Sequence, residues 1–275
     1  MKMAETGALT VIEGYREVAP KRNFEGETAI IDATGVHYRQ VNEALRAAVA
    51  GGARIVRLTG VNGQRYIGAG LRETGLTIEV DGTAGNDLAM FMDGPEIVID
   101  GNAQDGVGNT MAGGRVIVHG NAGDVVGYGM RGGQVFIRGD VGYRVGIHMK
   151  AFDRQVPVLV CGGKARDFFG EYMAGGIIVL LGTDTHFAEE PLVGCQLAAG
   201  MHGGVIYLRG DVRPWQHGAE VSVMPVGDED MAVLRPLVEE YAALFDADAA
   251  SLLAGSFTKV TPVSSRPYAK LYTSL

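Results

Sequence analysis

The chain has 275 residues, 47% of them hydrophobic, and a formal net charge of −8. An acidic chain without a basic run is a poor candidate for binding nucleic acid or an anionic membrane surface. Two cysteines make no disulfide framework, no apolar run approaches the ~20 residues of a membrane span, and the N-terminus lacks a signal-peptide core, so we expect a cytoplasmic protein.

Residues 1–53 are expected to form a short α/β lead-in. A strand is predicted around Ala29–Ile31 and a helix over 38–50, where apolar residues recur at helical spacing. Gly51 and Gly52 end this helix, and the chain returns as a strand after Arg54. A stacked repeat exposes an apolar end, so we expect this unit to cover it.

Residues 54–210 carry a repeat with a period of 19 residues. Gly101, Gly120 and Gly139 keep this spacing, and four methionines repeat it: Met92, Met111, Met130 and Met149. Such a period predicts a solenoid. Short β-branched strands with glycine corners, and no helical period within the repeat, favour a parallel β-helix of about seven coils over a leucine-rich repeat.

The strands sort into columns because side chains alternate between two faces. Two columns are apolar throughout and are predicted to line the interior. The column between them should point outward, yet it is apolar along most of its length: Val98, Ile117, Phe136, Leu159, Val179 and Tyr207. An apolar column of this height is expected to be covered, either by the chain's own termini or by a partner.

Residues 211–275 change in character. A linker is predicted over 211–228, a helix over 229–247 with Pro236 near its start, a short helix over 247–253, and an extended arm after Ser256. The arm supplies further candidate contacts for a partner: Phe257, Arg266, Tyr268 and Tyr272.

Several motifs could indicate a catalytic, nucleotide-binding or metal-binding site. Gly127–Gly132 matches G-x-G-x-x-G, but a strand follows it and its glycines recur in neighbouring coils, so we interpret them as corners. His186, Cys195 and His202 fit no compact zinc spacing. Stacked hydrogen bonds between coils are expected at the turn position shared by Asn102, Asn121 and Asp140. We therefore predict no catalytic, cofactor-binding or metal-binding residue on this chain.

The unit G-N-A-x-D-x-V-G-x-x-M-x-G-G, in 101–114 and 120–133, resembles the repeat of the GXGXG family. That family includes the C-terminal β-helical domain of the glutamate synthase large subunit and the C subunit of formylmethanofuran dehydrogenase. Residues 171–182 and 198–204 look closer to the glutamate synthase branch, and the lead-in and tail are similar to versions in which this domain is a separate polypeptide.

The resemblance implies an all-β solenoid, a right-handed parallel β-helix, that is structural. In a glutamate-synthase-like complex, other subunits would supply a glutamine amidotransferase and a synthase that carries FMN and iron–sulfur clusters. The same resemblance leaves N-methylglutamate synthase and the formylmethanofuran or formyltransferase branch open. An enzyme acting alone and a homo-oligomeric structural protein are the alternatives from other classes.

Overall fold

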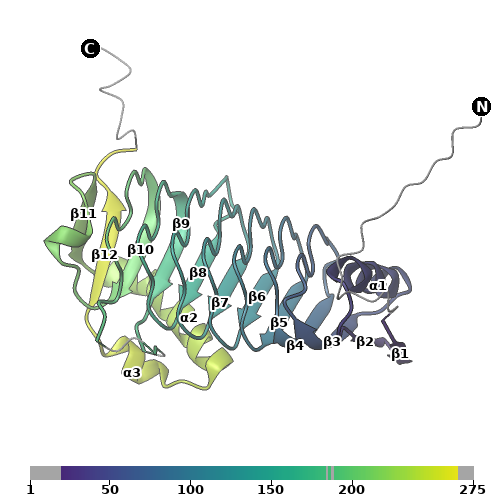
Figure 1. Ribbon diagram of the computed structural model, residues 1–275. Coiled ribbons are helices and arrows are strands. Elements are labelled where there is room, and N and C mark those ends of the chain that lie inside the picture. Colours follow the sequence, from purple (N-terminus) through teal and green to yellow (C-terminus); the bar gives the residue numbers. More distant parts are fainter. Residues whose placement is uncertain (1–19, 184, 187–188, 266–275) are drawn as a thin grey trace, which may run out of the picture.

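The computed structural model describes residues 20–183, 185–186 and 189–265. Figure 1 shows a solenoid with α1 at one end and α2 and α3 near the other, beside the large sheet. That sheet has twelve strands in the order β1 to β10, then β12 and β11. The strands are β1 Arg22–Glu25, β2 Thr28–Asp32, β3 Ile55–Asn62, β4 Thr77–Thr83, β5 Glu96–Asp100, β6 Arg115–Val118, β7 Gln134–Ile137, β8 Val158–Cys161, β9 Ala174–Leu180, β10 Gly203–Arg209, β11 Val221–Pro225 and β12 Phe257–Pro262.

The prediction of a parallel β-helix is confirmed. Every neighbouring pair from β2 to β10 is parallel, and the solenoid makes about six turns, close to the seven expected. The interior consists of several stacks of apolar side chains, and each coil contributes one residue to each stack. The methionine position of the repeat forms one such stack, buried throughout: Met92, Met111, Met130, Met149, Met173 and Met201.

The predicted register is wrong at β8. Leu159 pairs with Val135 and points into the core, while Val160 pairs with Phe136 and occupies the outward column. The expected register of β8 follows from the residue spacing after β7, across the inserted residues 151–155. In the structure Phe152 and Gln155 form a small antiparallel bridge, and the strand rejoins the ladder one residue later than expected. A shift of one residue exchanges the two faces of a strand, so this error moves Leu159 inside.

The lead-in helix is confirmed as α1, Tyr38–Ala50. Its buried stripe, Val41, Ala44, Leu45 and Ala48, belongs to the same apolar core as the coils, so α1 closes the N-terminal end of the stack. One strand of this lead-in was not predicted, the short β1, which pairs antiparallel with β2.

The C-terminal residues form two helices and two further strands. The predicted helices are α2 Asp228–Phe245 and α3 Ala249–Leu253, and Pro236 lies inside α2 with an exposed side chain instead of interrupting its start. Part of the expected arm is strand β12, which pairs antiparallel with β10 and with β11. β11 and the short 3-10 helix Pro214–Gln216 fall in the predicted linker. None of the helices in the described residues has the length and apolar character needed to cross a membrane.

Candidate functional site

The outward apolar column is covered by the chain itself. α2 lies along it, and its buried residues Leu234, Val238 and Tyr241 form one cluster with the column. The column members in the true register are Val98, Ile117, Phe136, Val160, Val179 and Tyr207. Of the two coverings left open by the sequence, the structure therefore contains the chain's own. Phe257 is buried in the same cluster, whereas Arg266, Tyr268 and Tyr272 lie outside the described residues.

Polar contacts fix α2 at its N-terminal end. The Tyr207 hydroxyl donates to the Asp230 carboxylate at 3.0 Å, and the Lys259 ammonium approaches the same carboxylate at 2.6 Å. Burial and the bond to Asp230 raise the pKa of the Tyr207 hydroxyl. Burial alone would raise the pKa of Asp230, but bonds from Lys259, the Gly227 backbone and Tyr207 outweigh it and lower that pKa. These contacts join one helix to two strands and contain no group poised for catalysis.

The middle of α2 is held by Arg115. This guanidinium forms an ion pair with Glu240 at 2.6 Å and lies over the ring of Phe136, with its central carbon 5.1 Å from the ring centroid. The column is thus apolar at its centre, and the charged groups at its margin are paired with each other, as in the interior of a folded domain.

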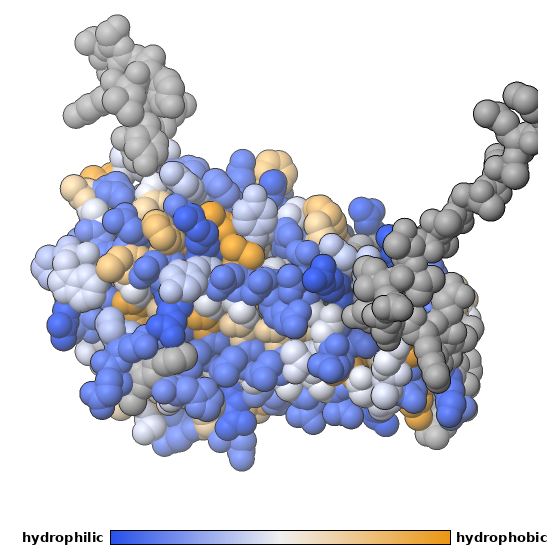
Figure 2. Space-filling model, in the orientation of Figure 1, coloured by the Kyte–Doolittle hydropathy of each residue, from blue (hydrophilic) through white to orange (hydrophobic). Residues whose placement is uncertain are grey.

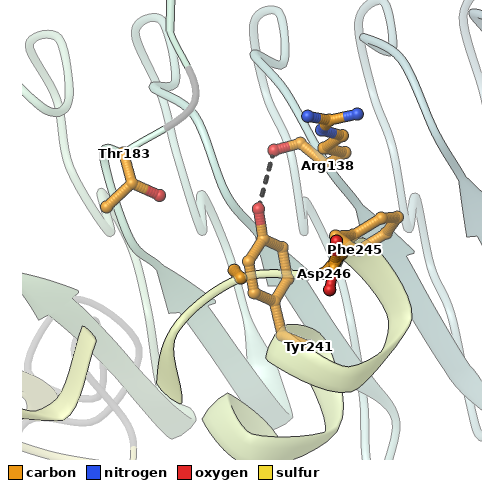
Figure 3. A pocket seen from close by; sticks show the side chains of 6 residues that line it. Arg138, Thr183, Tyr241, Phe245 and Asp246 are labelled. Carbon is orange, nitrogen blue, oxygen red and sulfur yellow. Dashed lines mark hydrogen bonds between the residues drawn. The ribbon is translucent and has the colours of Figure 1, made fainter. Parts of the chain in front are cut away.

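A pocket of about 300 Å³ opens where α2 ends (Figure 3). The Tyr241 hydroxyl donates to the backbone carbonyl of Arg138 at 2.9 Å across one side of it. Its remaining lining residues are Thr183, Phe245, Asp246 and Ala247. The ring of His119 meets Phe245 edge-on, with centroids 5.3 Å apart, so this histidine packs against the helix end. The lining combines the side chains of Arg138 and Asp246 with two aromatic rings, and its two hydroxyls, on Tyr241 and Thr183, both donate to backbone carbonyls.

The repeated Asx side chains serve the fold, as predicted. Asn102 accepts a hydrogen bond from the backbone N–H of Asn121, and Asn121 accepts one from that of Asp140, each at 2.8 Å. A second ladder repeats the arrangement with Asp105 and Asp124 at 2.9 Å. The glycines of the following coils leave room for these side chains, because a Cβ there would overlap the carboxylate or amide oxygen. The polar positions of the repeat are therefore occupied in holding coils together.

The candidate metal and nucleophile residues are not assembled. Cys161 faces the core in the column of Ile137, and burial raises the pKa of its thiol. Cys195 is exposed, and its backbone N–H bonds to Asp167. Within the described residues no group of three His, Cys, Asp or Glu side chains is arranged to hold a metal ion. Gly127 and Gly129 have positive φ at successive corners, which fits the interpretation of the G-x-G-x-x-G motif as corner glycines.

One group of exposed side chains was missed by the sequence analysis. Tyr128, His148 and Tyr172 lie on three successive coils, and the ring of His148 contacts the rings of both tyrosines. The signal was present, since His148 and Tyr172 each come directly before the repeated methionine. It was hidden because that position holds a different residue type in almost every coil.

Comparison with known proteins agrees with this architecture. The family model of the GXGXG motif matches residues 30–265, which include all the parallel strands beyond the first residues of β2. A protein of Methanocaldococcus jannaschii, named uncharacterized protein MJ1350, is 45% identical over 253 residues, covering 90% of this chain and 97% of the relative. The similarity thus extends over lead-in, repeat and C-terminal elements together. On these findings, the chain belongs to the GXGXG family.

Proposed function

We propose that the chain is a non-catalytic structural subunit of a cytoplasmic, glutamate-synthase-like complex. In this proposal one partner subunit is a glutamine amidotransferase that releases ammonia. Another carries FMN and iron–sulfur clusters and converts 2-oxoglutarate, ammonia and two electrons with their protons into glutamate. The chain itself holds these subunits in a fixed relative position.

The observation that carries this proposal is the GXGXG match over residues 30–265, together with the use that the repeat makes of its polar side chains. Asn102, Asn121 and Asp140 each accept a hydrogen bond from a backbone N–H of the next coil, and the buried Cys161 lies in the apolar core. A chain built in this way can provide a rigid surface on which partner subunits dock. Since each coil is bonded to the next along the whole stack, a partner docked on one coil is held at a defined distance from a partner docked on another.

Reconstitution tests the proposal directly. The chain is combined with the candidate amidotransferase and FMN-dependent synthase from the same organism, and complex formation is measured by sedimentation. Glutamine-dependent glutamate formation is compared with the ammonia-dependent reaction and with ammonia released into solution. We expect the chain to raise the glutamine-dependent reaction and lower ammonia release, with little change in the ammonia-dependent reaction.

The alternatives give different results in the same assay. A complex that forms glutamate poorly but accepts methylamine in place of ammonia would assign the chain to an N-methylglutamate synthase. Association with formyl-transferring subunits, and with neither glutamate-synthase subunit, would assign it to the other branch of the family. Turnover of a substrate by the chain alone would overturn the structural role.

A further inference from the structure

Tyr128, His148 and Tyr172 form a run of ring contacts on the surface of three successive coils, which we call the corner stack. His148 and Tyr172 are stacked with centroids 5.3 Å apart and planes at 11°, and Tyr128 meets His148 edge-on at 6.0 Å. Tyr128 and Tyr172 remain 41% and 39% exposed although they contact the histidine. Figure 2 shows that apolar side chains interrupt an otherwise hydrophilic face over the half of the solenoid nearer the C-terminal end.

The backbone does not require a ring at the position of His148 and Tyr172. His148 and Tyr172 have φ of 56° and 52°, a left-handed conformation that bulky side chains rarely adopt. Backbone hydrogen bonds place them in one ladder with Gly129 and with Thr110, and Gly129 shows that the fold accepts glycine at this position. The same position holds Phe91 and Thr110 in earlier coils, also with positive φ, so the fold accepts either a side chain or glycine here. Rings at two neighbouring corners are therefore a choice that the backbone does not impose.

A second feature adjoins the stack. The inserted hairpin 151–155 starts three residues after His148, and it packs beside Gly132 and Gly175 of the coils on either side. Phe152, which pairs with Gln155 across the turn, is 70% exposed, and Val156 after the hairpin is also exposed. The insertion therefore adds, next to the stacked rings, apolar side chains that are not packed in the core.

The sign of the net charge at this corner is opposite to that of the whole chain. The charged residues within three positions of the stacked rings, or in the hairpin, are three basic ones, Arg131, Lys150 and Arg154, and two acidic ones, Asp153 and Glu171. Glu171 is buried and paired with Arg144, whose guanidinium also lies 4.3 Å from the centroid of the Phe168 ring. The patch is thus net basic on a chain whose net charge is −8.

We infer that the corner formed by Tyr128, His148 and Tyr172, together with the hairpin 151–155, is a docking surface for a partner protein whose contacting face is acidic around an apolar anchor. Tyrosine and arginine around a central apolar contact are the composition of energetically dominant interface residues. The basic rim selects and steers an acidic partner, because complementary charge acts mainly on association. This inference rests on the proposed function, which supplies the partner as one of the two catalytic subunits.

The test uses a variant that separates docking from folding. His148→Gly/Tyr172→Gly removes two rings at positions where the backbone favours glycine, so its melting temperature should equal or exceed that of the parent protein. Binding of the amidotransferase and of the synthase subunit is measured for both proteins by surface-immobilised kinetics. We expect the affinity for one of the two subunits to fall about tenfold or more. The matched control is Phe91→Gly, which removes an exposed ring from the same backbone position three coils away and should leave both affinities unchanged.

A second variant addresses charge. Lys150→Glu/Arg154→Glu should slow association with the same subunit and reduce its dependence on salt, whereas Arg235→Glu on the outer side of α2 should not. Unchanged binding of both subunits by the glycine variant would overturn this inference and leave the proposed function standing. Failure of the parent protein to bind either subunit would instead overturn the proposed function and this inference with it.

Two other occupants are checked in the same samples. Self-association of the parent protein that the glycine variant loses would assign the corner to a second copy of the chain. Binding of a labelled single-stranded oligonucleotide, lost in the same variant, would assign it to nucleic acid. Either result would overturn the inference.

Discussion

The Tyr241 hydroxyl donates a 2.9 Å hydrogen bond to the backbone carbonyl of Arg138, joining the last turns of α2 to a coil corner 103 residues earlier in the chain. The bond lies beside Gly162, whose missing side chain leaves room for the tyrosine ring. It marks where the C-terminal helix is seated along the solenoid. The covering of the apolar column thus depends on a specific docking geometry as well as on apolar area.

Tyr241→Phe should lower the free energy of unfolding by about 1 kcal/mol, since it removes a partly buried hydrogen bond and keeps the ring. Urea unfolding followed by circular dichroism measures this. Tyr241→Ala also empties the space under α2 and should cost about 3–5 kcal/mol, as for other large aromatic truncations. Equal stability of Tyr241→Phe and the parent protein would contradict this prediction. It would show that the bond to Arg138 is worth no more than the bonds that the hydroxyl makes to water in the unfolded chain.

Phe136→Asp tests the covering of the column. Phe136 is fully buried between sheet and helix, and the Arg115 guanidinium above it is already paired with Glu240. A carboxylate placed there is desolvated at a cost of several kcal/mol, and exposing it requires α2 to leave the sheet. We expect proteolysis to cut between Gly227 and Asp248 in this variant while the coils, which do not contain Phe136 in their core, stay resistant.

The comparison variant is Phe136→Leu, which should cost less than about 1.5 kcal/mol because the site stays apolar and nearly filled. Phe91→Ala, on an exposed corner, should lie within about 0.5 kcal/mol of the parent protein. If Phe136→Asp keeps α2 protected from the protease, the column is not the surface that holds the helix.

Much of the fold was predictable because each coil repeats the same physical solution. The glycine and methionine spacing located the corners and the interior stack, and the helical stripe from Val41 to Ala48 located α1. The register failed at β8 because the insertion could be counted in two ways. Counting back from Gly163, which follows Cys161 by two residues, would have placed Leu159 inside.

The covering of the column and the corner stack were less accessible from sequence. The apolar residues of α2 show that this helix packs on something, but they do not say on which face of the solenoid. The pairing of Arg115 with Glu240 joins residues 125 positions apart without a local pattern to announce it. The ring contacts at the corner required the knowledge that His148 and Tyr172 occupy the same backbone position, which the insertion between them obscures.

Asp230 should make stability depend on pH. Its pKa is lowered in the folded protein, so the folded state favours the ionised carboxylate relative to the unfolded chain. The resulting stability is present above the ordinary aspartate pKa of about 3.9 and is lost as pH falls through the lower folded value. Urea unfolding between pH 7 and pH 2.5 should therefore show a smaller acid-induced loss for Asp230→Asn than for the parent protein.

Asp228→Asn is the matched control, since it removes the same charge from the same first turn of α2 without touching Tyr207 or Lys259. Its pH profile should keep the acid-induced loss of the parent protein at the low end of the range. Identical profiles for the two variants would indicate that the helix terminus in general, and not the Asp230 contacts, is responsible.

The Asx ladder makes a prediction about coupling. Asn121→Ala leaves the backbone N–H of the buried Asp140 without its acceptor and should cost about 1–3 kcal/mol. Gly139→Ala should cost about as much for a different reason, because its Cβ would overlap the Asn121 amide oxygen. In the double variant the overlapping atom is absent, so the total cost should fall below the sum by about 1 kcal/mol or more. Asp105→Ala with Gly139→Ala is the control: Asp105 accepts from Asp124 and lies against Gly123, so it shares no partner with Gly139, and these two changes should add within about 0.5 kcal/mol. Additive costs for Asn121 and Gly139 would show that the glycines of the repeat are required by the backbone alone, and not by the side chain stacked on the coil before them.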